Sequence, residues 1–114
     1  MYSSELIRGT LKTIVLKLLK EEGKMYGYEI TARVRELTDG KIEITEGALY
    51  PTLHSLEADG IVTTETMHIG RRVRKYYKLT AEGRAKAKRK LSEMADFLNT
   101  MRILFEGTAG LQNA

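Results

Sequence analysis

Segments with apolar residues at helical spacing come before and after a stretch rich in Thr, Ile and Val, and this order constrains the fold more than any other feature of the sequence. Three early segments carry an apolar residue every three or four positions, as one face of an amphipathic helix does. The helices predicted from this spacing span residues 6–20, 26–37 and 45–59. A brief alternation over residues 41–44 predicts a short strand before the third helix.

A second kind of pattern follows and favours two β-strands. Residues 61–69 are rich in Thr, Ile and Val, residues 73–79 form the returning strand, and Gly70 with two arginines lies between them as a tight turn. Tyr76 and Tyr77 are neighbours on the second strand and therefore face opposite sides of it. One of the two is expected in the core, and the sequence leaves open which one.

Thr80 is placed to cap a last helix that runs from Ala81 to about Phe105. The predicted fold class is therefore mainly α with a small β-hairpin: a winged helix-turn-helix domain followed by a long C-terminal helix. We assign residues 1–80 to the winged helix-turn-helix domain, including the N-terminal helix. Residues 81–105 form a C-terminal dimerisation helix, and residues 106–114 form a flexible tail.

The charge is concentrated in one stretch of the chain. Residues 71–90 hold ten basic side chains and only one acidic one, a net charge of +9, whereas the remaining residues carry −5 and the whole chain +4. A basic segment on an acidic body indicates a polyanionic partner, and nucleic acid is the simplest one. The alternative is a solvated basic face that only maintains solubility.

Composition excludes several other classes of protein. The chain of 114 residues has no Cys and only two His, so a disulfide scaffold and a thiolate metal site are excluded, and a reducing, cytoplasmic location fits. No apolar run is long enough to span a membrane, and the N-terminus lacks the layout of a secretory signal. No catalytic motif is present, and no cofactor, metal site or membrane association is expected.

In a winged helix-turn-helix the third helix lies in the major groove of DNA and the hairpin contacts phosphates beside it. Residues 45–60 contain no Arg or Lys, so the commonest specific contact to guanine is absent and base discrimination is expected to be modest. The candidate DNA-binding residues of this helix share its outward face: Thr45, Gly47, Tyr50, Pro51, His54 and Ser55.

The hairpin supplies the cations that the third helix lacks. Four basic side chains at or near its tip can straddle a phosphate backbone. They are Arg71, Arg72, Arg74 and Lys75. The alternative interpretation is protection of an exposed strand edge by charge, although four cations exceed what such protection needs.

The last helix carries an apolar seam in which the residues are spaced alternately four and three positions apart, as in a coiled coil. The predicted dimer-interface residues are Ala87, Leu91, Met94, Leu98, Met101 and Phe105. The alternative is that this face packs on its own domain. The three preceding helices already fill a core, so the seam favours a homodimer.

Several motifs, in this order, resemble the PadR-like family of transcriptional regulators over residues 7 to 105. They begin with Tyr26-Gly27-Tyr28-Glu29-Ile30 and continue with Glu46-Gly47-Ala48-Leu49-Tyr50-Pro51-Thr52-Leu53 and Leu56-Glu57-Ala58-Asp59-Gly60-Ile61-Val62. The hairpin and the helix after it add Gly70-Arg71-Arg72, Arg74-Lys75-Tyr76-Tyr77-Lys78-Leu79-Thr80 and Glu82-Gly83. The single short C-terminal helix is similar to that of the smaller subgroup of the family.

The resemblance implies a homodimeric repressor that binds double-stranded DNA and often responds to a small molecule. By the same resemblance, a small apolar effector would bind between the long helices of the dimer, near Met94, Phe97, Leu98 and Met101. These residues are equally suited to a plain dimer core. Two other functions remain open at this point: a winged-helix module that uses its basic hairpin to bind an acidic protein partner, and an RNA-binding protein.

Overall fold

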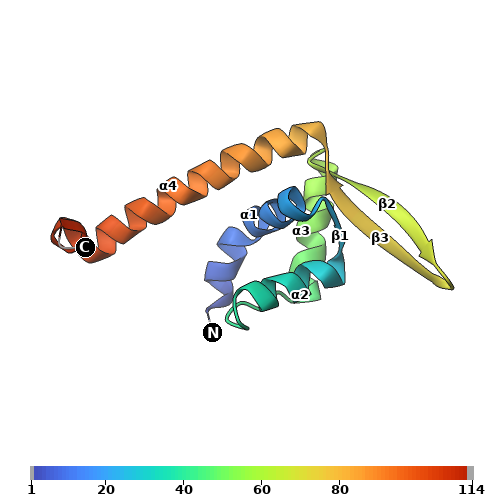
Figure 1. The fold of residues 1–114 in the computed structure, drawn as a ribbon, viewed down its shortest axis with the longest axis horizontal. Helices are drawn as coiled ribbons and strands as arrows, with labels where there is room; N and C mark the ends of the chain where they lie inside the picture. The colour runs from blue at the N-terminus through green and yellow to red at the C-terminus, as the bar shows by residue number, and fades with distance from the viewer. Residues whose placement is uncertain (1, 113–114) are drawn as a thin grey trace.

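The computed structural model describes residues 2–112 as four helices and a three-stranded antiparallel sheet (Figure 1). In chain order the elements are α1 (Ser4–Glu22), β1 (Lys24–Tyr26), α2 (Gly27–Leu37), α3 (Glu46–Ala58), β2 (Val62–Ile69), β3 (Arg72–Leu79) and α4 (Ala81–Gln112). The strand order is β1-β3-β2. The hairpin of β2 and β3 is the wing. The predicted winged-helix arrangement is therefore confirmed.

The core lies where α1, α2 and α3 meet the inner face of the sheet. Each helix contributes the residues that repeat at helical spacing, and burial of these side chains is the main favourable term that holds the helices together. The largest fully buried side chains are Val15, Leu16, Leu19, Ile30, Leu49 and Leu53. The wing and α4 leave this core in opposite directions, which gives the molecule its length of 59 Å (Figure 1).

The sheet contains a strand that the sequence did not predict. Residues Lys24–Tyr26 form β1, which pairs with β3 so that Met25 lies opposite Tyr77 and Tyr26 opposite Tyr76. Three residues are too few to show an alternating pattern, and the predicted second helix included Tyr26. On β3, Tyr77 is the buried tyrosine, with 2% of its surface exposed, and Tyr76 lies on the outer face.

The strand predicted over residues 41–44 is wrong, because these residues form a loop. Their alternation reflects the packing of Ile44 into the core and of Ile42 against its edge. The hydroxyl of Thr38 accepts a hydrogen bond from the Ile42 amide (3.1 Å), so a side chain satisfies a backbone group that a neighbouring strand would otherwise satisfy.

The wing joins α4 through a close backbone contact that explains the Thr80 and Gly83 motif. The Thr80 amide donates to the Ile61 carbonyl (3.0 Å), and the Thr80 hydroxyl accepts from the Gly83 amide (2.9 Å), which caps α4 as predicted. A Cβ atom on Gly83 would collide with the Ile61 carbonyl oxygen. Only glycine therefore allows α4 to start this close to β2.

The continuous part of the last helix ends close to Phe105, as predicted. Gly107 has non-helical dihedral angles (φ 78°, ψ 167°), and this kink separates the continuous part from a short second helical segment that reaches Gln112. The expected flexible tail over residues 106–114 is thus helical up to Gln112, and its last two residues lie outside the described part of the chain.

Candidate nucleic-acid interface

The third helix presents its polar side to solvent because its apolar side is anchored in the core. Leu49, Leu53 and Leu56 are buried. The predicted DNA-binding residues lie on the other side: Gly47, Tyr50, Pro51 and His54 are exposed, and Ser55 is half-buried. The structure therefore brings the candidates of this helix together on one outward face.

Thr45 has a different role from the others, because it is the N-cap of α3. Its hydroxyl oxygen accepts a hydrogen bond from the Ala48 amide (3.2 Å). The next residues, Glu46 and Gly47, are exposed, and no heavy atom blocks the space around Gly47 except the Thr45 hydroxyl 4.0 Å away. The backbone at the start of α3 is consequently open to a close ligand.

Tyr50 connects the two helices of the helix-turn-helix. Its hydroxyl lies so close to Gly27, the first residue of α2, that a Cβ atom at Gly27 would overlap it. The Tyr50 ring also lies 6.4 Å from the His54 ring, measured between centroids. Glycine at position 27 therefore makes room for the tyrosine side chain, which remains partly exposed beside His54.

The wing cations divide into two pairs. Arg71 lies in the turn after Gly70 (φ 62°), and Arg72 begins β3 opposite Ile69. Both side chains are exposed, and within residues 2–112 neither makes an ion pair. These two arginines are free to contact an external anion.

Arg74 and Lys75 instead contact the body of the domain. The guanidinium carbon of Arg74 lies 4.4 Å from the centre of the Tyr26 ring. The Lys75 ammonium lies 3.9 Å from a carboxylate oxygen of Glu57 and 5.5 Å from the centre of the Tyr77 ring. Of the four wing cations, Arg71 and Arg72 are thus the two without a contact of this kind within residues 2–112.

Glu57 was not identified from the sequence, although it joins α3 to both strands of the wing. Besides its ion pair with Lys75, its carboxylate accepts a hydrogen bond from the Thr64 hydroxyl on β2 (3.4 Å). Burial raises the pKa of the Tyr77 phenol, and the nearby charge of Glu57 raises it further. Nothing in the local sequence around Glu57 indicates these contacts, because both partners come from later strands.

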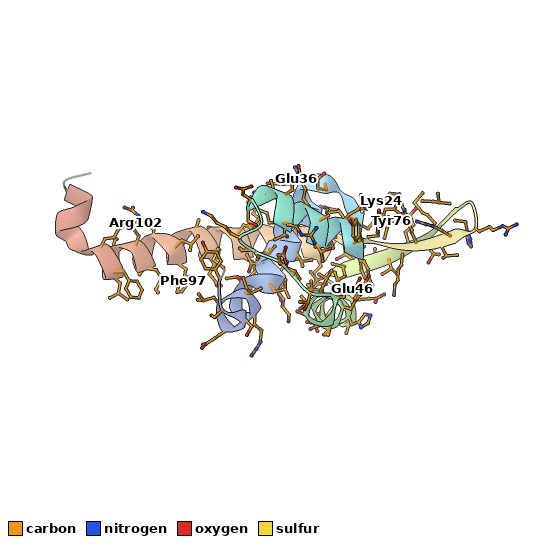
Figure 2. All side chains as sticks on the ribbon, turned by 90° about the horizontal axis from the view of Figure 1, so that it is seen from below. Lys24, Glu36, Glu46, Tyr76, Phe97 and Arg102 are labelled. Carbon is orange, nitrogen blue, oxygen red and sulfur yellow. The ribbon has the colours of Figure 1, made fainter. Side chains whose placement is uncertain are left out.

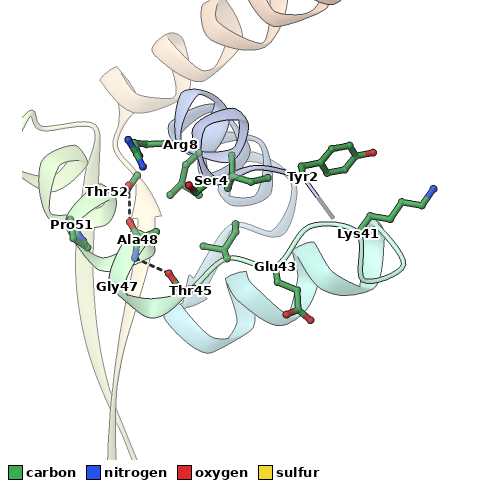
Figure 3. A pocket seen from close by; sticks show the side chains of 13 residues that line it. Tyr2, Ser4, Arg8, Lys41, Glu43, Thr45, Gly47, Ala48, Pro51 and Thr52 are labelled. Carbon is green, nitrogen blue, oxygen red and sulfur yellow. Dashed lines mark hydrogen bonds between the residues drawn. The ribbon is translucent and has the colours of Figure 1, made fainter.

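A groove of about 520 Å³ lies between the start of α1 and the start of α3 (Figure 3). It is lined by Gly47 and Pro51 of α3 and by two exposed cations that no sequence pattern singles out, Arg8 and Lys41. In Figure 3, Arg8 extends toward Thr52 on α3. Tertiary packing thus brings the Arg8 cation beside a helix that has no Arg or Lys of its own, and the acidic Glu43 lines the same groove.

Within residues 2–112, no group of three or more His, Cys, Asp or Glu side chains is placed so that it could bind a metal ion. His54 lies on α3, whereas His68 lies on β2 opposite Val73. The helices in this part of the chain also include none that is long and apolar enough to cross a membrane.

The predicted seam on α4 divides into a part that packs on its own chain and a part that is exposed. Ala87 is fully buried in the core of its own domain, so its assignment to a dimer interface is corrected. Leu91, Met94 and Met101 are half-buried. Leu98 and Phe105 are 60% and 77% exposed, and together with the exposed Phe97 and Leu104 they form an apolar surface on α4 of the kind that marks an interaction site.

Two of the four candidate effector residues line a groove of about 500 Å³ between α1 and α4. They are Met94 and Phe97, and the opposite wall includes Leu16 of α1 and Leu56 of α3. Leu98 and Met101 are not among the residues that line it. Charged side chains of both signs also line this groove, among them Lys86, Asp59 and the ion pair of Lys90 with Glu93.

Comparisons with known proteins agree with one another. The model of the transcriptional regulator PadR-like family matches residues 15–89. The transcriptional regulator Rv3488 of Mycobacterium tuberculosis is 41% identical over 64 residues, which cover 54% of this chain and 60% of that protein.

Solved structures show the same similarity. A transcriptional regulator from Clostridium thermocellum has a TM-score of 0.79 and 35% identity, with 90% of this chain and 96% of that one covered. Bacillus subtilis PadR in complex with operator DNA has a TM-score of 0.64 and 30% identity, over 71% of this chain and 46% of that one.

Proposed function

Because the chain belongs to the PadR-like family of transcriptional regulators, we propose that it represses transcription as a homodimer bound to a partly palindromic operator. The family consists of regulators and not of enzymes. The observation that carries the proposal is the polar, leucine-anchored face of α3 beside a wing tip with two unpaired arginines. A similar protein, Bacillus subtilis PadR, has been solved with operator DNA. A regulator acts where the chromosome is, so we also propose a cytoplasmic location.

In this proposal α3 lies in the major groove, and the tip of the wing contacts phosphates beside it. Arg71 and Arg72 neutralise phosphates, and each neutralised phosphate releases counterions. His54 and Ser55 reach base edges, whereas Gly47 lets the backbone approach a phosphate. Since α3 has no Arg or Lys, part of the specificity comes from the shape of the DNA and from the spacing of the two half-sites.

The exposed apolar stripe of α4 supports the homodimer. The second half of α4 has large apolar side chains that are exposed within a single chain: Phe97, Leu98, Leu104 and Phe105. Figure 2 shows Phe97 on α4. Pairing of two such helices would bury the stripe and would fix the distance between the two recognition helices at about 34 Å, one turn of DNA.

A small apolar effector would bind near Met94 and Phe97 in the groove between α1 and α4. Methionine adapts its shape to different ligands, which suits a pocket of this kind. A ligand wedged there would change the angle between α4 and the DNA-binding domain, and hence the spacing of the two half-sites. Thermal unfolding of the protein with a panel of flat aromatic compounds tests this part: a raised midpoint that is lost in Phe97→Ala supports it.

DNA binding is tested by fluorescence anisotropy with the DNA upstream of the chain's own gene and with a random duplex of equal length, at several salt concentrations. The wild type is expected to bind the upstream DNA at least about 10³-fold more tightly. The Arg71→Ala/Arg72→Ala variant is expected to flatten the salt dependence by about one unit of slope for each lost phosphate contact. The exposed variant Arg89→Ala, on α4, is the control for loss of charge.

Equal, weak binding to both duplexes, with no change of slope in the wing variant, would contradict the proposal. The basic wing would then be assigned to an acidic protein partner instead.

A further inference from the structure

Arg74 and Lys75 are adjacent on β3 and therefore extend from opposite faces of the wing. Lys75 lies on the inner face with the buried Tyr77, and its exposed ion pair with Glu57 is of a kind that contributes little and exchanges readily. Arg74 lies on the outer face, is half-buried, and has its guanidinium over the ring of Tyr26 at 4.4 Å. The two side chains thus join the wing to the body of the domain from both sides.

The outer contact is one end of a stack built by two strands. Tyr26 on β1 lies opposite Tyr76 on β3, and the rings meet edge to face at 5.4 Å and 82°. The ammonium of Lys24 lies 5.5 Å from the centre of the Tyr76 ring. The four side chains therefore form a series of contacts in which Arg74 lies on Tyr26, Tyr26 meets Tyr76, and Lys24 lies on Tyr76. Figure 2 shows Lys24 and Tyr76 together at the base of the wing.

The position of this stack in the sheet suits it to hold the outer half of the wing in a fixed orientation. The ladder between β1 and β3 ends at the pair Tyr26 and Tyr76, so the half of the wing beyond Tyr76 has no backbone partner from β1. Arg74 is two residues beyond the end of that ladder and reaches back to Tyr26. Its side chain continues the attachment of the wing where the hydrogen-bonded strands stop.

We propose that Arg74 is a positioning residue of the wing and not a phosphate ligand: by stacking on Tyr26 it fixes the angle at which Arg71 and Arg72 meet DNA. This inference rests on the proposed DNA binding. It divides the basic wing into cations that contact DNA at the tip and a cation that orients the tip from its base.

A planar guanidinium stacks on an aromatic ring in a way that an ammonium does not reproduce, whereas either group can neutralise a phosphate. Lysine at position 74 therefore separates the two roles. Tyr26→Leu removes the ring without changing any charge, and Tyr26→Phe keeps the ring.

The experiment measures the affinity of the full chain for the upstream DNA by anisotropy, with circular dichroism and urea unfolding as checks on the fold. We expect Arg74→Lys and Tyr26→Leu each to weaken binding by roughly fivefold, and the double variant by no more than either single one. Tyr26→Phe is expected to bind like the wild type. In the Arg71→Ala/Arg72→Ala background, Arg74→Lys is expected to have no further effect, because no tip contact is left to orient. Arg89→Lys, on the solvent side of α4, is the matched control.

A second readout needs no variant. Ring current from Tyr26 is expected to shift the side-chain protons of Arg74 upfield in the NMR spectrum of the free protein, and the shift is expected to persist in the DNA complex. The inference is overturned if Arg74→Lys binds like the wild type, if the effects of Arg74→Lys and Tyr26→Leu add, or if the shift is lost on DNA. Absence of specific DNA binding by the wild type would overturn the proposed function and this inference together. Wild-type binding with any of the three results above would overturn the inference alone.

Discussion

At the scale of single residues, the structure explains why glycine stands at two positions where neighbouring elements approach closely. Gly83 faces the Ile61 carbonyl, which belongs to rigid backbone, whereas Gly27 faces the end of the Tyr50 side chain, which can move. A Cβ atom is therefore more costly at Gly83 than at Gly27. The cost differs because a backbone carbonyl is harder to displace than the end of a side chain.

We predict that Gly83→Ala lowers the free energy of unfolding by about 2 kcal/mol, because the new methyl group forces α4 away from β2. Urea unfolding followed by circular dichroism measures this. Gly9→Ala is the matched control, since Gly9 is on the exposed side of α1 with no atom within 4 Å. It is expected to stabilise the protein by about 0.5–1 kcal/mol. Equal effects of both substitutions would contradict the close contact at Gly83.

Tyr77 gives a prediction about pH. Because burial, assisted by Glu57, raises the pKa of its phenol above the usual value of 10.0, the folded state holds the proton more tightly than the unfolded state. The associated stability is complete below pH 10 and is lost as the pH rises through the folded pKa. Tyr77→Phe cannot ionise, so its stability should fall less than that of the wild type between pH 9 and about 11. Parallel curves of unfolding free energy against pH for the two proteins would contradict this prediction.

At the scale of elements, the sequence predicts those parts whose pattern is local. The helices are predictable because their periodicity extends over many residues, and the hairpin because β-favouring residues flank a Gly70 turn. The cap at Thr80 is predictable because it lies directly before its helix. The strand β1 is too short to show an alternating pattern. The loop that contains Ile42 and Ile44 shows the alternation of a strand without forming one. Ala87 fits the spacing of the seam, but only the packing of α4 on α1 shows that it is buried within its own chain.

The same limit applies to the candidate site. The outward face of α3 and the tip of the wing follow from local pattern, whereas the contacts of Glu57, Arg74 and Arg8 join residues far apart in the sequence. In the sequence, Arg74 and Arg71 are equivalent basic residues of the hairpin. The structure separates them because Arg74 lies over the Tyr26 ring. Charge can thus be read from sequence, but its availability to a ligand depends on tertiary structure.

Glu57 leads to a prediction at this scale, since it connects α3 to the wing. Glu57→Gln removes the charge that holds Lys75, and because the pair is exposed its loss should change the free energy of unfolding by less than about 1 kcal/mol. Lys75 then becomes available to phosphate, so binding to DNA should tighten and its salt dependence should steepen by up to about one unit. Anisotropy at several salt concentrations measures both. Weaker binding of the variant would show that the tie between α3 and the wing matters more than the freed cation.

At the scale of the whole molecule, the wing and α4 extend from the core in opposite directions (Figure 1). In the proposed homodimer, the wing contacts DNA and the projecting end of α4 contacts the second copy. Because affinity for a two-fold operator depends on both half-sites binding together, the exposed end of α4 would then affect DNA binding although it lies far from the wing.

We predict that Leu98→Asp/Phe105→Asp converts a dimer into a monomer, because two charges within the apolar stripe oppose its burial. Sedimentation equilibrium should give about twice the chain mass of 12.9 kDa for the wild type and the single mass for the variant. Ser92→Asp is the control, since Ser92 is exposed on α4 outside the seam. A monomeric wild type, or a variant that still dimerises, would contradict the predicted interface.

The most direct test of the account is hydroxyl-radical footprinting of the protein on the DNA upstream of its own gene. A homodimer that places one α3 in each of two successive major grooves should protect two segments related by two-fold symmetry, with centres about 10 base pairs apart. The Leu98→Asp/Phe105→Asp variant should lose both protected segments at the same protein concentration. A single protected segment that persists in this variant, or no protection by the wild type, would contradict the account.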